Sequence, residues 1–384
     1  MKIEEYGIGN VRSHVRYFRN ILNVLPSRYS YLDSQRLVIA QFALGGLSFL
    51  GAIDQLQNKE EFIEWIYSLQ SPHGGFFGSK IMKELPSHLA KPHIASTFAA
   101  VQCLILLGDE LDRIHIPELL SWIKSLMNPD GSFQGAADAS EPTDLREFTY
   151  CAAFLIHIFG TSNFSDEDRK RAVQYIISCQ SPDTAFGQVP GAEGHGALTF
   201  CALASLKFFG CLHSDEGVLS AAELKRIVRF CVNRQSEGIH GRPHKPDDTC
   251  YTFWTCAALK LAQPSIDISE KLDKERVLSF VRSCVDENIG GIKKLNAKNQ
   301  YADATHSYFA LAGLGVIFDD VMPEYMLKKD LTKRVLRIRN RVKESKLDSS
   351  NSLLSRAGNL ALSVSFAILS VYATYLLREP LTSA

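Results

Sequence analysis

Trp65-Ile66-Tyr67-Ser68-Leu69-Gln70-Ser71-Pro72-His73-Gly74-Gly75-Phe76 runs from a helix-like pattern through a polar turn into a Gly-Gly-aromatic element. The same order returns at residues 122–133 and 175–187, and in weaker form at 230–238 and 280–291. Successive copies are roughly 50 to 58 residues apart, which leaves room for two helices and their turns in each unit. The pattern therefore predicts a repeat protein built from helix pairs.

The second helix of each pair is expected between these copies. Apolar residues recur at helical spacing in the segments 93–107, 146–159, 196–209, 250–261 and 304–318. Strand signals are almost absent, so the predicted class is all-α. Helix pairs either stack into an open solenoid or close on themselves, and five or six pairs predict an α/α toroid with an inner and an outer ring. The small and aromatic residues of the inner segments would line a deep apolar cavity or simply pack as core.

The two ends of the chain differ in character. Residues 11–25 and 35–57 have helical periodicity, and Gly45-Gly46 inside the second segment favours close helix packing. We assign residues 1–346 to the toroid and 347–384 to a polar linker and an apolar tail. The tail's apolar run, 360–377, is marginal in length for a membrane span of about 20 residues. A docked helix, a membrane tail and a non-native end of the reading frame all remain open for it.

Composition excludes some classes of partner and compartment. Lys+Arg and Asp+Glu both number 42, so net charge indicates neither nucleic acid nor an anionic membrane. The 9 cysteines are dispersed without a CxxC pair, which is typical of reduced thiols in a cytoplasmic protein. The N-terminus is acidic and has no apolar segment, so no secretory signal is expected.

A loop at residues 238–251 gathers the side chains best suited to chemistry. Pro243 and Pro246 prevent a regular helix there, and an apolar helical pattern follows. Asp248 and Cys250 offer a carboxylate and a thiol, which suit zinc. Arg242 and Lys245, in the same loop, suit a phosphate. The competing interpretation of the loop is a charged surface turn.

Other segments could complete such a site. His306, at the start of an inner helix one repeat later, would give zinc a third ligand and leave one position open, as in catalytic zinc sites. His195, one repeat earlier, could converge with Arg242, Lys245 and Tyr251 on an anion; alone, it would be read as a core histidine. No GxxxxGK[ST] loop is present, which argues against a nucleoside triphosphate.

The joint spacing of these residues resembles the β subunit of protein prenyltransferases. The resemblance covers about residues 11–320 and rests on Gly194-His195-Gly196, Arg242-x-x-Lys245-x-x-Asp248-x-Cys250-Tyr251-x-Phe253-Trp254 and Asp303-x-x-His306. It implies an α/α barrel whose apolar funnel holds an isoprenoid diphosphate. It also implies an obligate α subunit, and zinc that binds the cysteine of a CaaX protein substrate as a thiolate. By itself, the chain is expected to be inactive.

The resemblance also implies roles for single residues. Asp248, Cys250 and His306 would bind zinc, beside Tyr251. The diphosphate would be bound by His195, Arg242, Lys245, Tyr251 and a lysine of the α subunit. A substrate carboxylate is read in this family by an arginine three residues before a Tyr-Cys pair. Here that position is Glu147, with Arg146 one residue earlier. Either the helix register slips locally or peptide recognition differs.

Within the family, the segments 25–29, 34–44 and 63–70 resemble the geranylgeranyltransferase type I β subunit. Its donor would be geranylgeranyl diphosphate, with Val38, Phe42 and Trp254 along the isoprenoid chain. Val38 stands where farnesyltransferases carry a tryptophan. Lys294 stands where they carry a magnesium-recruiting aspartate, so magnesium should not be required. The expected targets are CaaX proteins such as Rho-type small GTPases.

Other functions were weighed against this one. A farnesyltransferase or a Rab geranylgeranyltransferase β subunit is the alternative within the family. Triterpene cyclases have similar repeats but need an aspartate-rich acid motif, where this chain has Cys250. A non-catalytic helical scaffold is the alternative from another class, and it would not require the proposed ligands and anion-binding residues to occur together.

Overall fold

The computed structural model describes residues 6–86, 88–138, 141–215 and 217–344. The chain divides into two compact units, Met1–Val335 and Leu336–Ala384. All the elements below lie in the first unit; residues 336–344 of the second are helical. The predicted boundary at residue 346 and the apolar run 360–377 lie outside the described residues. Within those residues, no helix combines the length and apolar character that a membrane span needs.

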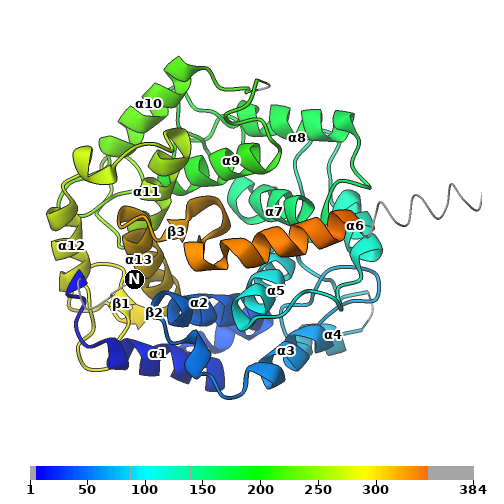
Figure 1. Ribbon diagram of the computed structural model, residues 1–384, viewed down its shortest axis with the longest axis horizontal. Helices are drawn as coiled ribbons and strands as arrows, with labels where there is room; N and C mark the ends of the chain where they lie inside the picture. Colours follow the sequence, from blue (N-terminus) through cyan, green and yellow to red (C-terminus); the bar gives the residue numbers. More distant parts are fainter. Residues whose placement is uncertain (1–5, 87, 139–140, 216, 345–384) are drawn as a thin grey trace, which may run out of the picture. The chain divides into compact units, whose positions relative to one another are not determined.

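The first unit is a double ring of helices (Figure 1). The inner ring contains α2 (Arg36–Phe49), α5 (Ile94–Leu107), α7 (Tyr150–Phe159), α9 (Gly196–Phe208), α11 (Tyr251–Ala262) and α13 (Ala304–Ile317). The outer ring contains α1 (Val11–Asn23), α3 (Lys59–Ser68), α6 (Ile116–Ser125), α8 (Asp166–Ser178), α10 (Ala221–Val232) and α12 (Lys274–Ser283). Each inner helix contacts the next, and α13 contacts α2, which closes the ring. The predicted all-α toroid is confirmed, with six helix pairs in the described residues.

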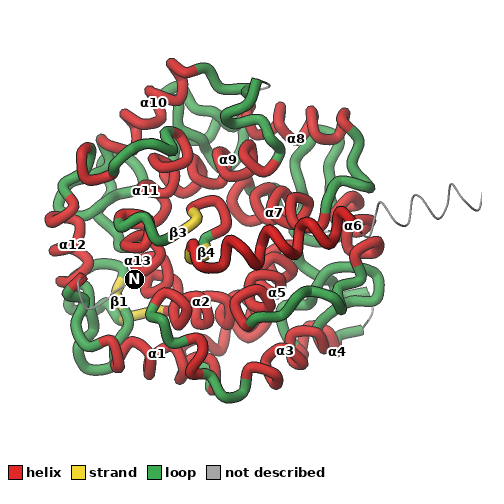
Figure 2. Tube along the Cα trace, in the orientation of Figure 1, coloured by secondary structure: helices red, strands yellow, loops and turns green. Residues whose placement is uncertain are grey.

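The remaining elements are short. They are a five-residue helix, α4 (Lys80–Glu84), and a π-helical turn, η4 (Leu145–Thr149). The 3-10 turns are η2 (Ser27–Gln35), η3 (Ile53–Gln55), η5 (Ile268–Glu270), η6 (Pro323–Tyr325) and η7 (Lys329–Leu331). The strands form two antiparallel pairs: β1 (Ile292–Lys293) with β2 (Ala302–Asp303), and β3 (Val321–Met322) with β4 (Leu327–Lys328). As Figure 2 shows, strands are a minor part of this helical fold.

The sequence repeat corresponds to one structural device. After an outer helix, the chain turns back on itself through an isolated antiparallel bridge before it enters the inner helix. The bridges are Gln70↔Phe76, Met127↔Phe133, Gln180↔Phe186, Gln235↔Ile239 and Val285↔Ile292. The aromatic residue of the motif is thereby placed in the core, where Phe76, Phe133 and Phe186 are fully buried. Each bridge therefore lies between an outer helix and the inner helix that follows it.

Close packing explains the paired glycines of α2. A Cβ atom on Gly45 would collide with the ring of Tyr308, and one on Gly46 would collide with the ring of Phe18. Tyr308 belongs to α13 and Phe18 to α1, so the two glycines let α2 approach a neighbour in each ring. The packing interpretation of Gly45-Gly46 is confirmed. The helix itself is shorter than the predicted 35–57, because Gly51 takes a positive φ of 66° soon after its end.

Candidate active site

The loop before α11 is held in shape by Asp247. Its carboxylate accepts hydrogen bonds from Ser236 Oγ (2.6 Å) and the backbone N–H of Gly238 (2.8 Å). The N–H of Asp248 donates to the carbonyl of Ile239 at 3.0 Å. With the loop so fixed, the Asp248 carboxylate is directed inward, where the residue is only 6% exposed.

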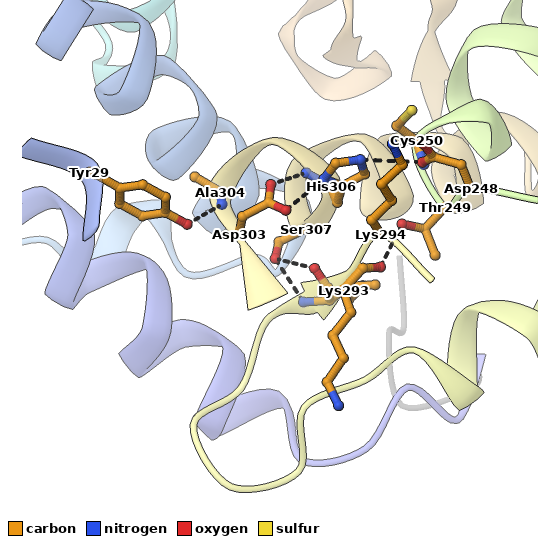
Figure 3. A network of polar contacts seen from close by, with 11 residues as sticks. Tyr29, Asp248, Thr249, Cys250, Lys293, Lys294, Asp303, Ala304, His306 and Ser307 are labelled. Atoms are coloured by element: carbon orange, nitrogen blue, oxygen red, sulfur yellow. Dashed lines mark hydrogen bonds and ion pairs between the residues drawn. The ribbon is translucent and has the colours of Figure 1, made fainter. Parts of the chain in front are cut away.

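Three potential metal ligands meet at this point. Asp248 ends the loop, Cys250 caps α11, and His306 lies in the first turn of the adjacent helix α13. One ligand atom from each lies within 4.8 Å of the other two. His306 Nε2 is 3.3 Å from Asp248 Oδ1 (Figure 3). The structure thus brings together the three residues that were predicted as a cluster.

Asp303 supports this cluster from behind, and sequence reasoning assigned it no role. Its carboxylate caps α13 by accepting the N–H of His306 at 2.9 Å, and its Oδ2 lies 2.6 Å from His306 Nδ1. With Nδ1 donating to Asp303, Nε2 of a neutral His306 carries the lone pair that a metal requires. An acidic residue three positions before a histidine at a helix start is the signal that could have revealed it.

The segment around β1 is hydrogen-bonded both to the loop before α11 and to the start of α13. The hydroxyl of Thr249 donates to the carbonyl of Lys293 (2.8 Å), and its N–H donates to the carbonyl of Lys294 (2.9 Å). Ser307 Oγ accepts the N–H of Ile292 at 2.7 Å. Lys294 follows the strand and places its ammonium 3.6 Å from Asp248 Oδ2 (Figure 3). The loop before α11 and the start of α13 are therefore held in a fixed relation.

The carboxylate of Asp248 raises the pKa values of both Cys250 and His306. Burial, together with the neighbouring Asp248 carboxylate, raises the pKa of the Cys250 thiol well above its usual range. Burial lowers the pKa of His306, but its hydrogen bonds to Asp248 and Asp303 outweigh this effect and raise it to about 9. Without a cation, the site would therefore hold these protons at neutral pH. A carboxylate, a thiol and an imidazole so placed fit zinc, whose ligands are of these types.

A second pair of residues lies beside the cluster. The Nδ1 of His195 accepts the N–H of Ala197 at 3.1 Å, and its Nε2 lies 2.8 Å from the hydroxyl of Tyr251. Burial and, to a smaller extent, the nearby Arg242 lower the pKa of His195 to about 4, so the ring is neutral at pH 7. Since Nδ1 accepts, the proton is on Nε2, and His195 donates to Tyr251 Oη. The hydroxyl proton of Tyr251 is then available for another acceptor.

A large cavity lies beside Cys250 and the His195–Tyr251 pair. Its volume is about 620 Å³, and it is lined by His195, Cys250 and Tyr251 and by the predicted pocket residues Val38, Phe42 and Trp254. A smaller cavity of about 240 Å³ shares His195 and Arg146 with it and adds Arg242. Arg242 itself is paired with Glu193 at 2.9 Å. Lys245 is exposed, and neither it nor Lys294 is among the lining residues of these two cavities.

Arg146 reaches the large cavity because of a change in helix type. Residues Leu145–Thr149 form the π-helical turn η4, which Asp144 caps by accepting the N–H groups of Arg146 (2.6 Å) and Glu147 (3.1 Å). A π turn accommodates one more residue than an α turn does. The sequence left open a local slip in register or a different peptide recognition, and the π turn is a local departure from the α-helical register at this place. Arg146 and Glu147 both line the cavity, and they pair with each other at 2.5 Å.

Comparison with known proteins agrees with this architecture. The family model of the prenyltransferase alpha-alpha toroid domain matches residues 10–352. The chain belongs to that family. A prenyltransferase of Arabidopsis thaliana, the geranylgeranyl transferase type-1 subunit beta, is 34% identical over 79% of this chain and 84% of its own. The protein farnesyltransferase subunit beta of Schizosaccharomyces pombe is 30% identical over 81% of this chain and 79% of its own.

A solved structure has the same fold as this prenyltransferase chain. It is the Candida albicans protein geranylgeranyltransferase-I complexed with GGPP, with a TM-score of 0.76 over 85% of this chain and 98% of that one. Its sequence is 21% identical, so the likeness concerns the fold. The resemblance to prenyltransferase β subunits that the sequence indicated is confirmed.

Asp303 provides a test of the candidate metal site. We expect Asp303→Asn to weaken zinc affinity about 10- to 100-fold, the usual cost of losing a carboxylate behind a histidine ligand. Asparagine can still cap α13, so the melting temperature should change little. Zinc affinity would be measured by competition with a chelator. The matched control is Asp273→Asn, which changes another helix-capping aspartate, at α12. Unchanged zinc affinity in Asp303→Asn would contradict the assigned role.

Proposed function

We propose that the chain is the catalytic β subunit of a cytoplasmic protein geranylgeranyltransferase type I. It would transfer the geranylgeranyl group from geranylgeranyl diphosphate to the cysteine of C-terminal CaaX motifs, including those of Rho-type small GTPases. The observation that carries the proposal is that Cys250 of the Asp-Cys-His cluster and the His195–Tyr251 pair line one cavity. The Arabidopsis relative is named as a β subunit, which supports an obligate α subunit as partner.

The acceptor side of the reaction would lie at the cluster. Asp248, Cys250 and His306 would hold one zinc ion and leave a position for the acceptor sulfur. When bound, zinc would supply the positive charge that lowers the pKa of a cysteine thiol and makes the thiolate available at neutral pH. Asp303 keeps the His306 ring in the tautomer and orientation that binding needs. The fixed relation between α11 and α13 keeps the three ligands in place as substrates enter and leave.

The donor side would lie at the His195–Tyr251 pair. Negative charge develops on the diphosphate as its bond to C1 of the isoprenoid breaks, and donors already in position stabilise it. Tyr251 accepts from His195 and can therefore donate its own proton to a phosphate oxygen. Arg242, on the wall of the smaller cavity, would leave Glu193 to bind the same group. Lys245 and a lysine of the α subunit would add charge from the rim.

Two residues favour the geranylgeranyl donor over the farnesyl donor. Val38 lines the cavity where a tryptophan would fill it, and so leaves room for a longer chain. Lys294 carries a fixed ammonium close to Asp248, which supports diphosphate binding without magnesium. Arg146 is proposed to bind the carboxylate of the CaaX peptide. The alternative is a farnesyltransferase, in view of the 30% identical Schizosaccharomyces pombe relative, or a Rab geranylgeranyltransferase.

A donor-competition assay tests this proposal. The chain would be co-expressed with an α subunit and supplied with zinc, a CaaX peptide ending in leucine, and equal amounts of farnesyl and geranylgeranyl diphosphate. The expected result is geranylgeranyl transfer that is the same with and without magnesium. Farnesyl transfer that requires magnesium would instead assign the chain to the farnesyltransferases. No transfer from either donor, with an assembled heterodimer, would overturn the proposal.

A further inference from the structure

The segment after α13 folds back into the ring. Strands β3 and β4 pair with each other, and the turn between them consists of η6 and Met326. Figure 2 shows both strands inside the ring of inner helices. The segment that follows α13 therefore occupies the centre of the ring in this view.

Three successive carbonyl groups of this turn are bound by three different inner helices. The carbonyls of Glu324, Tyr325 and Met326 accept, respectively, from Tyr150 Oη of α7 (2.9 Å), Gln102 Nε2 of α5 (2.8 Å) and Tyr308 Oη of α13 (3.1 Å). Side chains add two further contacts: the hydroxyl of Tyr325 lies 2.7 Å from His157 Nε2, and Lys207 pairs with Glu324 at 2.7 Å. The backbone of residues 324–326 cannot move away from the ring axis without breaking these bonds.

Cys250 stands at the N-terminal end of α11, whereas the turn is also bound by residues farther along the inner helices. Cavity-lining residues such as Val38, Phe98 and Cys201 come from the first two turns of the inner helices. Among the residues that bind the turn, Gln102 and His157 come from the third turns of α5 and α7. Tyr150 and Tyr308 bind it with their terminal hydroxyl groups from the first turn of α7 and the second turn of α13. The first two turns of all six inner helices named above line this one cavity, so these helices run in the same direction and their third turns lie deeper than the lining residues.

Met326 is the lining residue that the turn contributes. It is 5% exposed, and its φ of 54° is left-handed. This backbone conformation is uncommon for a residue with a side chain. Because its carbonyl is bound by Tyr308 and its neighbours are bound as well, the depth of the cavity at this point depends on the volume of the Met326 side chain.

We propose that Met326 is the floor of the isoprenoid cavity and limits the length of the chain that the enzyme accepts. This inference rests on the proposed function. With the diphosphate and C1 beside Tyr251 and Cys250, as proposed above, the far end of the isoprenoid would extend toward Met326. The thioether chain is flexible and adapts to the shape of what contacts it, which suits the branched end of a polyisoprenoid. Val38 leaves room at the side wall of the cavity, whereas Met326 would form its floor.

The test uses the zinc-loaded heterodimer and three donors, the C15, C20 and C25 polyprenyl diphosphates. Met326→Ala should raise the kcat/KM ratio of the C25 to the C20 donor roughly 10- to 100-fold, the range that small changes in an apolar pocket produce. Met326→Phe should lower C20 transfer relative to C15 by a similar factor. The affinity for each diphosphate would be measured by calorimetry without peptide. In each variant it should change in the same direction as kcat/KM for that donor.

Met322→Ala is the matched control, because Met322 is a buried methionine of the same hairpin that does not line this cavity. Met322→Ala should change the melting temperature about as much as Met326→Ala does, but should keep the wild-type donor ratios. The inference is overturned if the wild type transfers the C20 group while Met326→Ala and Met326→Phe both keep its donor ratios. If one variant fails to fold, the ratio of the other decides. A wild-type heterodimer that binds and transfers no polyprenyl donor would overturn the proposed function itself.

Discussion

Replacing Cys250 with alanine is expected to leave the β subunit without zinc and to lower kcat/KM at least about 1,000-fold. Alanine would remove one of the three proposed ligands, which come from the junction before α11 and from the start of α13, and the remaining carboxylate and imidazole would not complete a tetrahedral site. Activation of the acceptor thiol is then lost, at a cost of several kcal/mol in the transition state. Zinc content would be measured by atomic absorption on the purified heterodimer, and turnover by transfer to a CaaX peptide.

Cys256→Ala is the control for this experiment. Cys256 belongs to the same helix, α11, is fully buried and does not line the cavity. The same chemical change there should reduce stability slightly and leave zinc at one ion per heterodimer. Wild-type turnover in Cys250→Ala would contradict the metal site, and equal zinc loss in both variants would show that the effect is not local to Cys250.

Replacing Val38 with tryptophan is expected to reverse the donor preference from the C20 to the C15 diphosphate. Val38 lies in the first turn of α2, is half-buried and lines the cavity. An indole there would occupy volume that the fourth isoprene unit needs, and overpacking of an apolar site typically costs 1–3 kcal/mol. That corresponds to a fall of roughly 5- to 150-fold in kcat/KM for the C20 donor.

The comparison variant is Val38→Ala, which enlarges the cavity and should keep the C20 preference. Both donors would be present in one reaction, so that the ratio of the products reports selectivity directly. A C20 preference that survives in Val38→Trp, with an unchanged melting temperature, would show that the wall at α2 does not set chain length.

The fold could be predicted from the sequence because a similar turn motif recurs between the outer and the inner helix of successive repeats. A polar turn followed by a large apolar residue marks the five returns named above, and the bridge Gln70↔Phe76 shows that return in structural form. The cluster of Asp248, Cys250 and His306 was predictable for a related reason. A loop-to-helix junction occurs at the same place in each repeat, so residues one repeat apart meet at one end of the ring.

Three features of the site could not be predicted from the spacing of residues along the sequence. The turn that contains Arg146 is π-helical, and the sequence pattern does not reveal a π turn. Asp303 is a helix cap by pattern, and its second bond, to the His306 ring, depends on a side-chain rotamer. Met326 enters the cavity through a turn whose position is fixed by bonds to three distant helices. Local periodicity carries no information about such contacts.

The contact between α2 and α13 also has a consequence for how this chain becomes a folded protein. These helices lie near opposite ends of the ring in sequence, and the flank of α2 that carries Gly45 packs against Tyr308. A ribosome releases α2 long before α13, so the nascent chain exposes this apolar flank until most of the toroid has been made. Contacts between such distant segments form slowly because a long loop must close first. We therefore expect ring closure to be the rate-limiting step of folding, and an arrested, open ring to be the species that aggregates or engages chaperones.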